Sequence, residues 1–231
     1  MAKKIIIIIY LIIQLILSIL SQLTDNPLWA IVSFSIVSLA FLMNFMFMKK
    51  SLSFLFTALA LTFTVFSDVL LVLLDKYYLT AVISFIFVQI FYSCRIVVNT
   101  KSLKLKNLHI ASRISLSLIS IILVSIILKD DADLLTIASA ICFVNLVLNV
   151  ITSFINYKNK SDSLIFAIGL LLFMLCDFFV GINNIEYILE ISRDSLIYQI
   201  IYNNYIFFPW LFYAPSQALL GLSSKKDTAI K

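Results

Sequence analysis

The stretch Leu52–Leu74 reads LSFLFTALALTFTVFSDVLLVLL, and Asp68 is the only charged residue among its twenty-three side chains. An α-helix rises about 1.5 Å per residue, so about twenty apolar residues cross a hydrocarbon core about 30 Å thick. A carboxylate inside such a helix costs about 2.5–3.5 kcal/mol on insertion scales. The stretch therefore predicts a membrane-spanning helix that carries a functional carboxyl group.

The whole chain has the composition of a membrane protein. Its 231 residues are 62% hydrophobic and 13% charged, whereas soluble domains are about 45–50% apolar and about 25% charged. The apolar runs are continuous and lack the alternation of a membrane β-barrel. We expect an all-α polytopic membrane protein, one domain over residues 1–231, with eight spans: Ile5–Leu23, Leu28–Met48, Leu52–Leu74, Leu79–Asn99, Leu108–Leu128, Leu134–Asn156, Ser163–Ile182 and Ile200–Leu222.

The first apolar run follows Lys3 and Lys4, as the core of a signal peptide does. It is longer than a typical signal core, and no small-residue cleavage site ends it. We interpret it as a retained helix.

The distribution of basic residues predicts the orientation. With the N-terminus cytoplasmic, fourteen of the seventeen lysines and arginines lie inside, and only Lys76, Lys129 and Arg193 lie outside. Cytoplasmic loops are enriched in such residues, so we expect both termini in the cytoplasm. The net charge of +5 favours anionic lipid headgroups over nucleic acid as a partner. The basic run from Arg95 to Arg113 is interpreted as an inner-leaflet anchor; for Arg95 itself, a snorkelling anchor and a phosphate ligand both remain open.

A second aspartate, Asp177, lies in a similar apolar stretch, and the two stretches show a weak repeat. Lys50-Ser51 precedes Asp68 by 18 residues, and Lys160-Ser161 precedes Asp177 by 17. The chain is therefore interpreted as two four-helix halves related by an axis along the membrane normal. Both aspartates are expected about 7 Å outward of the midplane, where they can share one cavity.

Other polar residues inside the spans are candidates for lining that cavity. Gln89, Tyr92 and Arg95 share a helix face by their spacing of three, and the last span contains two prolines that bend it. The predicted substrate-binding residues are Lys50, Gln89, Tyr92, Arg95, Tyr205, Tyr213 and Gln217. A simpler interpretation is available for several polar residues. Hydrogen bonds between helices are favoured for Gln89, Asn145 and Asn149, and a protonated carboxyl that joins two helices is the alternative for each aspartate.

The residue types present exclude several chemistries. His109 is the only histidine, so neither a zinc site with several histidines nor a Ser-His-Asp triad within the membrane is expected. Cys94, Cys142 and Cys176 fall inside predicted helices and are interpreted as small buried residues. No metal and no other cofactor is predicted. What remains is a site of two carboxyls, tyrosines and amides.

Five short motifs, in order, resemble those of the YhhN-like membrane family, which includes lysoplasmalogenases. They are Lys50-Ser51-Leu52, Ser67-Asp68-Val69-Leu70-Leu71, Phe85 to Gln89 and Tyr92, Phe173 to Cys176-Asp177, and Tyr213 to Gln217. Three positions depart from the family pattern: Ser67 replaces a glycine, Cys176 a serine and Gln89 a histidine. The resemblance runs from about Lys49 to Leu222 and agrees with eight helices.

The resemblance implies that the substrate is a membrane lysophospholipid with a vinyl ether bond, which is hydrolysed to a fatty aldehyde and a glycerophospho-headgroup. Such hydrolysis begins with protonation of the β-carbon and passes through an oxocarbenium ion. It needs one neutral carboxylic acid and one carboxylate, as in glycosidases. Asp68 and Asp177 are the predicted catalytic pair, with the assignment of acid and carboxylate left open.

The alternative is a membrane protein without enzymatic activity, either a proton-coupled transporter or a lipid-binding module. Buried aspartates are equally expected in proton relays, and transporters also contain repeated halves. For either function we expect the plasma membrane of a bacterium as the location.

Overall fold

The computed structural model describes residues 2–23, 28–47, 51–129, 132–156, 161–185 and 207–224. All regular elements in these ranges are helices: α1 (Ala2–Leu23), α2 (Leu28–Phe47), α3 (Leu52–Asp68), the π-helix η1 (Val69–Leu73), α4 (Tyr78–Asn99), α5 (Leu103–Leu128), α6 (Leu134–Ile155), α7 (Ser161–Ile185) and α9 (Phe207–Leu222). Seven are long and apolar enough to cross a membrane, with η1 counted as part of the α3 span. The predicted all-α polytopic fold is confirmed, and α9 corresponds to the eighth span, whose residues 200–206 lie outside the described ranges.

One predicted boundary is wrong by five residues. Helix α5 begins at Leu103, whereas hydropathy placed the start at Leu108. Ser102 caps this helix, because its hydroxyl oxygen accepts a hydrogen bond of 3.4 Å from the backbone N–H of Leu105. A polar first turn is therefore part of the helix even though it is not part of the apolar run.

Side-chain caps also fix the starts of two other helices. The Ser51 hydroxyl accepts a hydrogen bond of 3.1 Å from the backbone N–H of Phe54 at the start of α3. The Asp133 carboxylate accepts one of 2.7 Å from the backbone N–H of Thr136 at the start of α6. Hydrogen bonds from the side chain and then the backbone of Thr136 hold the pKa of Asp133 below its usual value.

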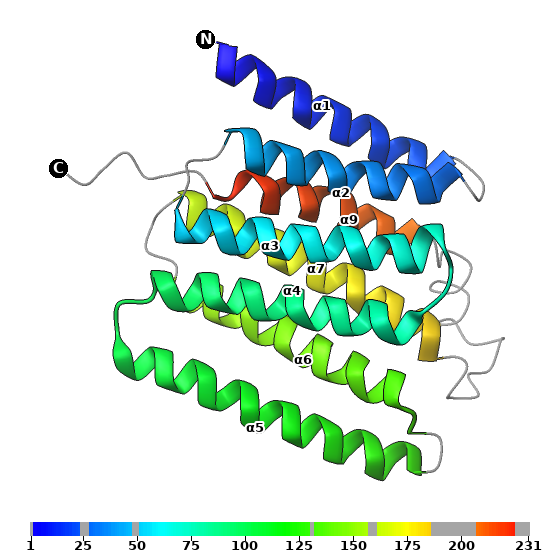
Figure 1. The fold of residues 1–231 in the computed structure, drawn as a ribbon, viewed down its shortest axis with the longest axis vertical. Coiled ribbons are helices and arrows are strands. Elements are labelled where there is room, and N and C mark those ends of the chain that lie inside the picture. Colours follow the sequence, from blue (N-terminus) through cyan, green and yellow to red (C-terminus); the bar gives the residue numbers. More distant parts are fainter. Residues whose placement is uncertain are drawn as a thin grey trace.

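The helices lie roughly side by side, with α1 and α5 at opposite edges of the bundle (Figure 1). Helix α1 packs on α2 and α9, and α5 packs mainly on α6. Most side chains of α5 are exposed, and most of the exposed ones are apolar. Since lipid tails are as apolar as leucine, such surfaces suit a hydrocarbon surrounding.

The core lies between these edges. Tyr92 on α4, Leu146 on α6, and Leu170 and Phe173 on α7 are all fully buried, as is Leu220 on α9. They belong to one continuous hydrophobic cluster. The core also brings the last described helix next to an early one, because α9 packs closely against α2 as well as α7.

The packing of the helices repeats between the two halves of the chain. The pairs α1/α2, α2/α3 and α3/α4 correspond to α5/α6, α6/α7 and α7/α9. Between the halves, α4 packs on α6 as α9 packs on α2. In each half the third and fourth helices form the most extensive contact. This correspondence supports the predicted arrangement of two four-helix halves, with Asp68 on α3 and Asp177 on α7 at related places.

The third span changes its helix type at the first aspartate. Helix α3 ends at Asp68, and the chain continues as the π-helix η1, in which the Leu74 N–H donates to the Val69 carbonyl at 2.9 Å. A π-turn holds one extra residue and rotates the side chains that follow it. Such turns occur frequently at functional sites. No glycine or proline marks this position in the sequence.

Gly221→Ala is expected to destabilise the bundle where α9 crosses α2. An added Cβ would lie 2.9 Å from the carbonyl oxygen of Ala40 and 3.2 Å from its Cα, and these backbone atoms cannot turn away. Overpacking of this kind costs about 1–3 kcal/mol. Gly181→Ala is the matched control, because nothing lies within 4 Å of its added Cβ. Thermal unfolding in detergent should show a lower Tm for the first variant only; equal Tm values would contradict the close approach.

Candidate functional site

The structure places the two predicted aspartates within electrostatic range of each other. Asp68 is only 4% exposed, and the hydroxyl of Tyr213 on α9 donates a hydrogen bond to its Oδ2 atom. Asp177 on α7 is half-buried, and its carboxyl group lies close enough to act electrostatically on both Asp68 and Tyr213. Three helices thus contribute one polar group each to a single place in the apolar core.

Aromatic rings hold the phenol of Tyr213 in place. The ring of Phe173 meets it edge-on at 6.3 Å between centroids, and Trp210 meets it at 5.4 Å and 87°. Phe173 in turn packs against Phe85 of α4 at 6.0 Å. Rings packed in this way limit the rotation of the tyrosine, so its hydroxyl stays directed at Asp68.

Two serines fix the position of Asp68 by joining α3 to α4. The Ser67 hydroxyl donates to the carbonyl of Ala81 at 2.8 Å, and the Ser84 hydroxyl donates to the carbonyl of Phe63 at 2.9 Å. Each bond crosses from one helix to the other within about one and a half turns of Asp68. Ser67, which replaces the glycine of the family pattern, therefore has a structural role of its own.

Two cysteines lie near the second aspartate. Cys142 and Cys176 are both buried, and both are within electrostatic range of Asp177. Both are free thiols, as is Cys94. Cys142 and Cys176 are buried, as predicted for small residues of the core, whereas Cys94 is only half-buried.

A layer of unpaired polar atoms lies next to these groups; we call Gln89, Tyr92 and Gln217 the middle polar layer. All three side chains are fully buried. Among the described residues, Nε2 of Gln89, the hydroxyl of Tyr92 and Oε1 of Gln217 have no hydrogen-bond partner. An unpaired buried polar atom costs about 1–3 kcal/mol, so each of the three atoms favours a polar partner.

Contacts with α7 give the order of these groups along the bundle. Phe173 lies at the level of Tyr213, and Phe166, two turns earlier on α7, packs against Tyr92 at 5.6 Å. Gln217 follows Tyr213 by four residues on α9, and Gln89 precedes Tyr92 by three on α4. The middle polar layer therefore lies between the aspartates and the end of the bundle that contains Arg95.

Arg95 is locked inside the bundle. It is 4% exposed, and its Nη1 donates to the hydroxyls of Thr57 at 2.7 Å and Ser223 at 2.6 Å. Its Nη2 donates to the Ser223 carbonyl at 2.6 Å, and the guanidinium stacks 3.8 Å above the ring of Phe166. The interpretation of Arg95 as a snorkelling anchor is wrong, because the charged head is turned inward and held there by α3 and α9.

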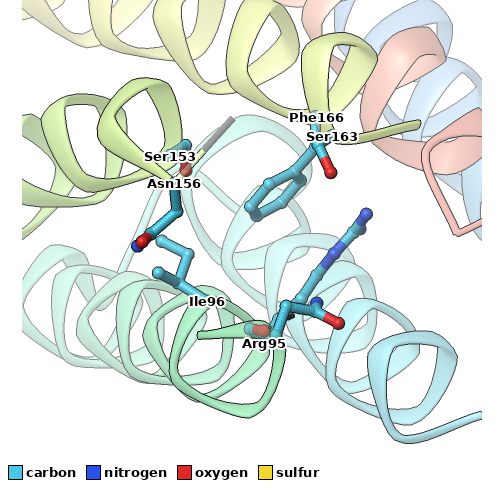
Figure 2. Close-up of a pocket in the computed structure, with 7 residues that line it drawn as sticks. Arg95, Ile96, Ser153, Asn156, Ser163 and Phe166 are labelled. Atoms are coloured by element: carbon cyan, nitrogen blue, oxygen red, sulfur yellow. Dashed lines mark hydrogen bonds between the residues drawn. The ribbon is translucent and has the colours of Figure 1, made fainter. Parts of the chain in front are cut away.

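A small recess opens beside this arginine. Its volume is about 50 Å³, and its lining combines Arg95, Ile96, Asn99, Ser153, Asn156, Ser163 and Phe166 from α4, α6 and α7 (Figure 2). Such a space holds a few waters or one small anionic group. The charge of Asp162, in the first turn of α7, also acts on Arg95.

The comparisons with known proteins give one match. The sequence profile of the YhhN family matches residues 28–223. The chain belongs to the YhhN family. The search of curated proteins and the search of solved structures each give no match. The YhhN match begins at the first residue of α2 and runs just past the end of α9, so it contains both aspartates, Tyr213 and the middle polar layer, whereas α1 lies outside it.

Two of the predicted substrate-binding residues of this YhhN chain, Lys50 and Tyr205, lie outside the described residues. Of the other five, Tyr213 contacts Asp68. The middle polar layer consists of Gln89, Tyr92 and Gln217. Arg95 lies at the recess. Pro215 is inside α9, two residues after Tyr213. Because proline lacks an N–H, it leaves a carbonyl one turn earlier without its helical donor.

A polar network joins α5 to α6 that the sequence did not predict. The interpretation of Arg113 as part of an anchor is wrong, because its guanidinium is turned inward. Nε donates to His109 Nε2 at 3.1 Å, Nη1 to Asn145 Oδ1 at 2.8 Å and Nη2 to Asn149 Oδ1 at 2.5 Å. The favoured interpretation of Asn145 and Asn149 as residues that join helices is confirmed. The spacing of four in both pairs, on α5 and on α6, is the signal that predicts facing side chains.

Proposed function

We propose that this YhhN protein hydrolyses the vinyl ether bond of a lysoplasmalogen to a fatty aldehyde and a glycerophospho-headgroup. The observation that carries the proposal is the hydrogen bond from Tyr213 to Asp68 with the carboxyl of Asp177 within electrostatic range. A buried phenol that donates to a carboxylate favours its charged form. Two carboxyls within electrostatic range of each other in an apolar core hold one proton between them more readily than none.

On the strength of the hydrogen bond from Tyr213 to Asp68, we assign Asp177 as the acid and Asp68 as the carboxylate. Asp177 transfers its proton to the β-carbon of the vinyl ether, and the C=C electron pair forms the new C–H bond. The resulting oxocarbenium ion is stabilised by the negative charge of Asp68. Water then adds to the cationic carbon, and Asp68 accepts the proton that the water loses.

The hemiacetal decomposes with the two roles reversed. Asp68 returns its proton to the glycerol oxygen as the C–O bond breaks, and Asp177 accepts the proton of the hemiacetal hydroxyl. The products are the aldehyde and the glycerol hydroxyl, and both aspartates regain their starting states. Each carboxyl therefore acts once as an acid and once as a base.

The unpaired polar atoms favour one orientation of the lipid. The middle polar layer and the Arg95 recess both lie on the same side of the aspartates. Placing the glycerol along the middle polar layer gives these buried polar atoms partners. The alkenyl chain then extends from Asp177 towards the exposed side chains of Phe178 and Val180 on α7.

Aldehyde release in deuterated water tests both the reaction and its first step. The purified protein in detergent should convert a lysoplasmalogen to an aldehyde that carries one deuterium on its second carbon, because that carbon is protonated from exchangeable carboxyl protons. The aldehyde is reduced at once to prevent exchange and analysed by mass spectrometry. The saturated ether analogue is the control and should give no aldehyde. Aldehyde without deuterium would contradict protonation at carbon.

The alternative is a proton-coupled transporter or lipid-binding module that uses the same aspartates. The repeated packing of the two halves favours it, because transporters are often built from such repeats. Vesicles containing the protein would then show proton-linked uptake of a lipid while no aldehyde forms.

A further inference from the structure

A one-way chain of hydrogen bonds leads from Arg113 into the core. A guanidinium has only donors, so the oxygen of Asn149 must face Arg113. The Asn149 amide nitrogen is then left to donate, and it does so to Oε1 of Gln89 at 3.0 Å and to the Gln89 carbonyl at 3.0 Å. Because the Gln89 oxygen is occupied in this way, its Nε2 must point away from α6.

Arg113, which can only donate, allows the hydrogen bonds through Asn149 to Gln89 to run in one direction only. Amide side chains can exchange the places of oxygen and nitrogen, so a network of asparagines and glutamines alone has two similar states. An arginine within a membrane span is costly, yet Arg113 bonds only to neutral side chains in the network described here: His109, Asn145 and Asn149. The consequence of its presence is an amide at position 89 with a fixed orientation.

The free end of the chain is complementary to a hydroxyl group. Nε2 of Gln89 is an unpaired donor, and Oε1 of Gln217 is an unpaired acceptor in the same layer. A hydroxyl accepts one hydrogen bond and donates another. In a lysophospholipid the free hydroxyl of glycerol lies between the ether oxygen and the phosphate.

The order of groups in the lipid matches the order of groups in the bundle. Asp68 and Tyr213 come first, and Gln217 follows Tyr213 by about 6 Å along α9. Vinyl ether and hydroxyl occur in the same sequence. This match rests on the proposed function.

We propose that Gln89 binds the free glycerol hydroxyl of the lysophospholipid and that Arg113, acting through Asn149, is the positioning residue that holds the Gln89 amide in the binding orientation. The donor of Gln89 and the acceptor of Gln217 together then recognise a lipid whose second glycerol carbon carries a hydroxyl. Arg113 itself touches no substrate.

The test compares two ligands that cannot be hydrolysed: 1-O-hexadecyl-glycero-3-phosphocholine and its 2-deoxy analogue. Binding to the full chain in nanodiscs is measured by titration calorimetry, with empty nanodiscs subtracted. The wild type should bind the hydroxyl ligand about tenfold more tightly, which corresponds to about 1.4 kcal/mol. Equal affinities for the two ligands would overturn the proposal.

Three variants separate orientation from packing. Asn149→Asp keeps the size of the side chain and accepts from Arg113, but an ionised carboxylate cannot donate, so Gln89 must turn its Nε2 towards α6. This variant and Gln89→Met should both lose the tenfold preference. Arg113→Lys retains a residue that only donates, and this variant should keep most of the preference for the hydroxyl ligand.

The outcomes distinguish this inference from the proposed function. A folded Asn149→Asp variant that keeps the preference overturns the role of Arg113. If Asn149→Asp does not fold, a Gln89→Met variant that keeps the preference overturns the proposal. A wild type that prefers the hydroxyl ligand but releases no aldehyde from a lysoplasmalogen overturns the hydrolase and leaves the hydroxyl site supported. A wild type that binds neither ligand overturns both.

Discussion

Asp68→Asn and Asp177→Asn should each lower the rate of aldehyde release from a lysoplasmalogen by about 10²–10⁴-fold, the usual contribution of general acid–base catalysis. An amide has the size of a carboxyl group but neither supplies a proton to carbon nor carries the negative charge that stabilises an oxocarbenium ion. Both losses are expected because each carboxyl acts in both halves of the proposed reaction. The rates are measured with purified protein in detergent, by trapping the aldehyde.

Asp133→Asn is the matched control for these two variants. Asp133 caps α6 outside the apolar run, and asparagine is an equally good capping residue, so its aldehyde release should equal that of the wild type. All three variants should elute as one species and unfold within a few degrees of the wild type. Near-normal activity of either site variant in a folded protein would remove that aspartate from the mechanism.

The fold was accessible from sequence because the membrane leaves few choices. Backbone groups in hydrocarbon must pair within the chain, so continuous apolar runs have to become helices. The ends of the helices were harder to predict from the sequence. The start of α5 depends on the Ser102 cap, and the π-turn after Asp68 has no marker among the neighbouring residues.

The sequence predicted site residues only where a side chain is costly to place in an apolar span whichever way it points. Asp68 and Asp177 could be recognised because a carboxyl in an apolar span must find a polar surrounding. Arg95 and Arg113 stand near a run of lysines, and the same sequence fits an anchor or a buried network. The helices that carry them are apolar on most sides, so periodicity does not tell which face is inside. Packing alone decided that both arginines turn inward.

The contact between Tyr213 and Asp68 was also not predictable from the sequence. Tyr213 was selected for its spacing from other polar residues on the last span, which gives no partner. The partner comes from the approach of α9 to α3, two helices separated by most of the chain. In this YhhN chain the first half supplies one carboxyl and the second half supplies the phenol and the other carboxyl.

Tyr213→Phe should lower kcat/KM for aldehyde release by about 10- to 100-fold while the protein remains folded. The substitution removes only the hydroxyl that donates to Asp68, and a hydrogen bond to a charged group contributes about 1.5–3 kcal/mol. The aromatic contacts of the ring with Phe173 and Trp210 remain. Kinetics with purified protein measure the loss, and thermal unfolding measures the fold.

Tyr10→Phe is the control for this substitution, because Tyr10 is also buried but lies on α1, outside the YhhN match. Its activity should equal that of the wild type. The residual activity of Tyr213→Phe should exceed that of Asp68→Asn, since the phenol supports the carboxylate but does not replace it. If Tyr213→Phe instead inactivated the protein as completely as Asp68→Asn, the phenol would itself transfer a proton and Asp68 would serve to orient it. Unchanged kinetics would show that the carboxylate is stabilised without Tyr213.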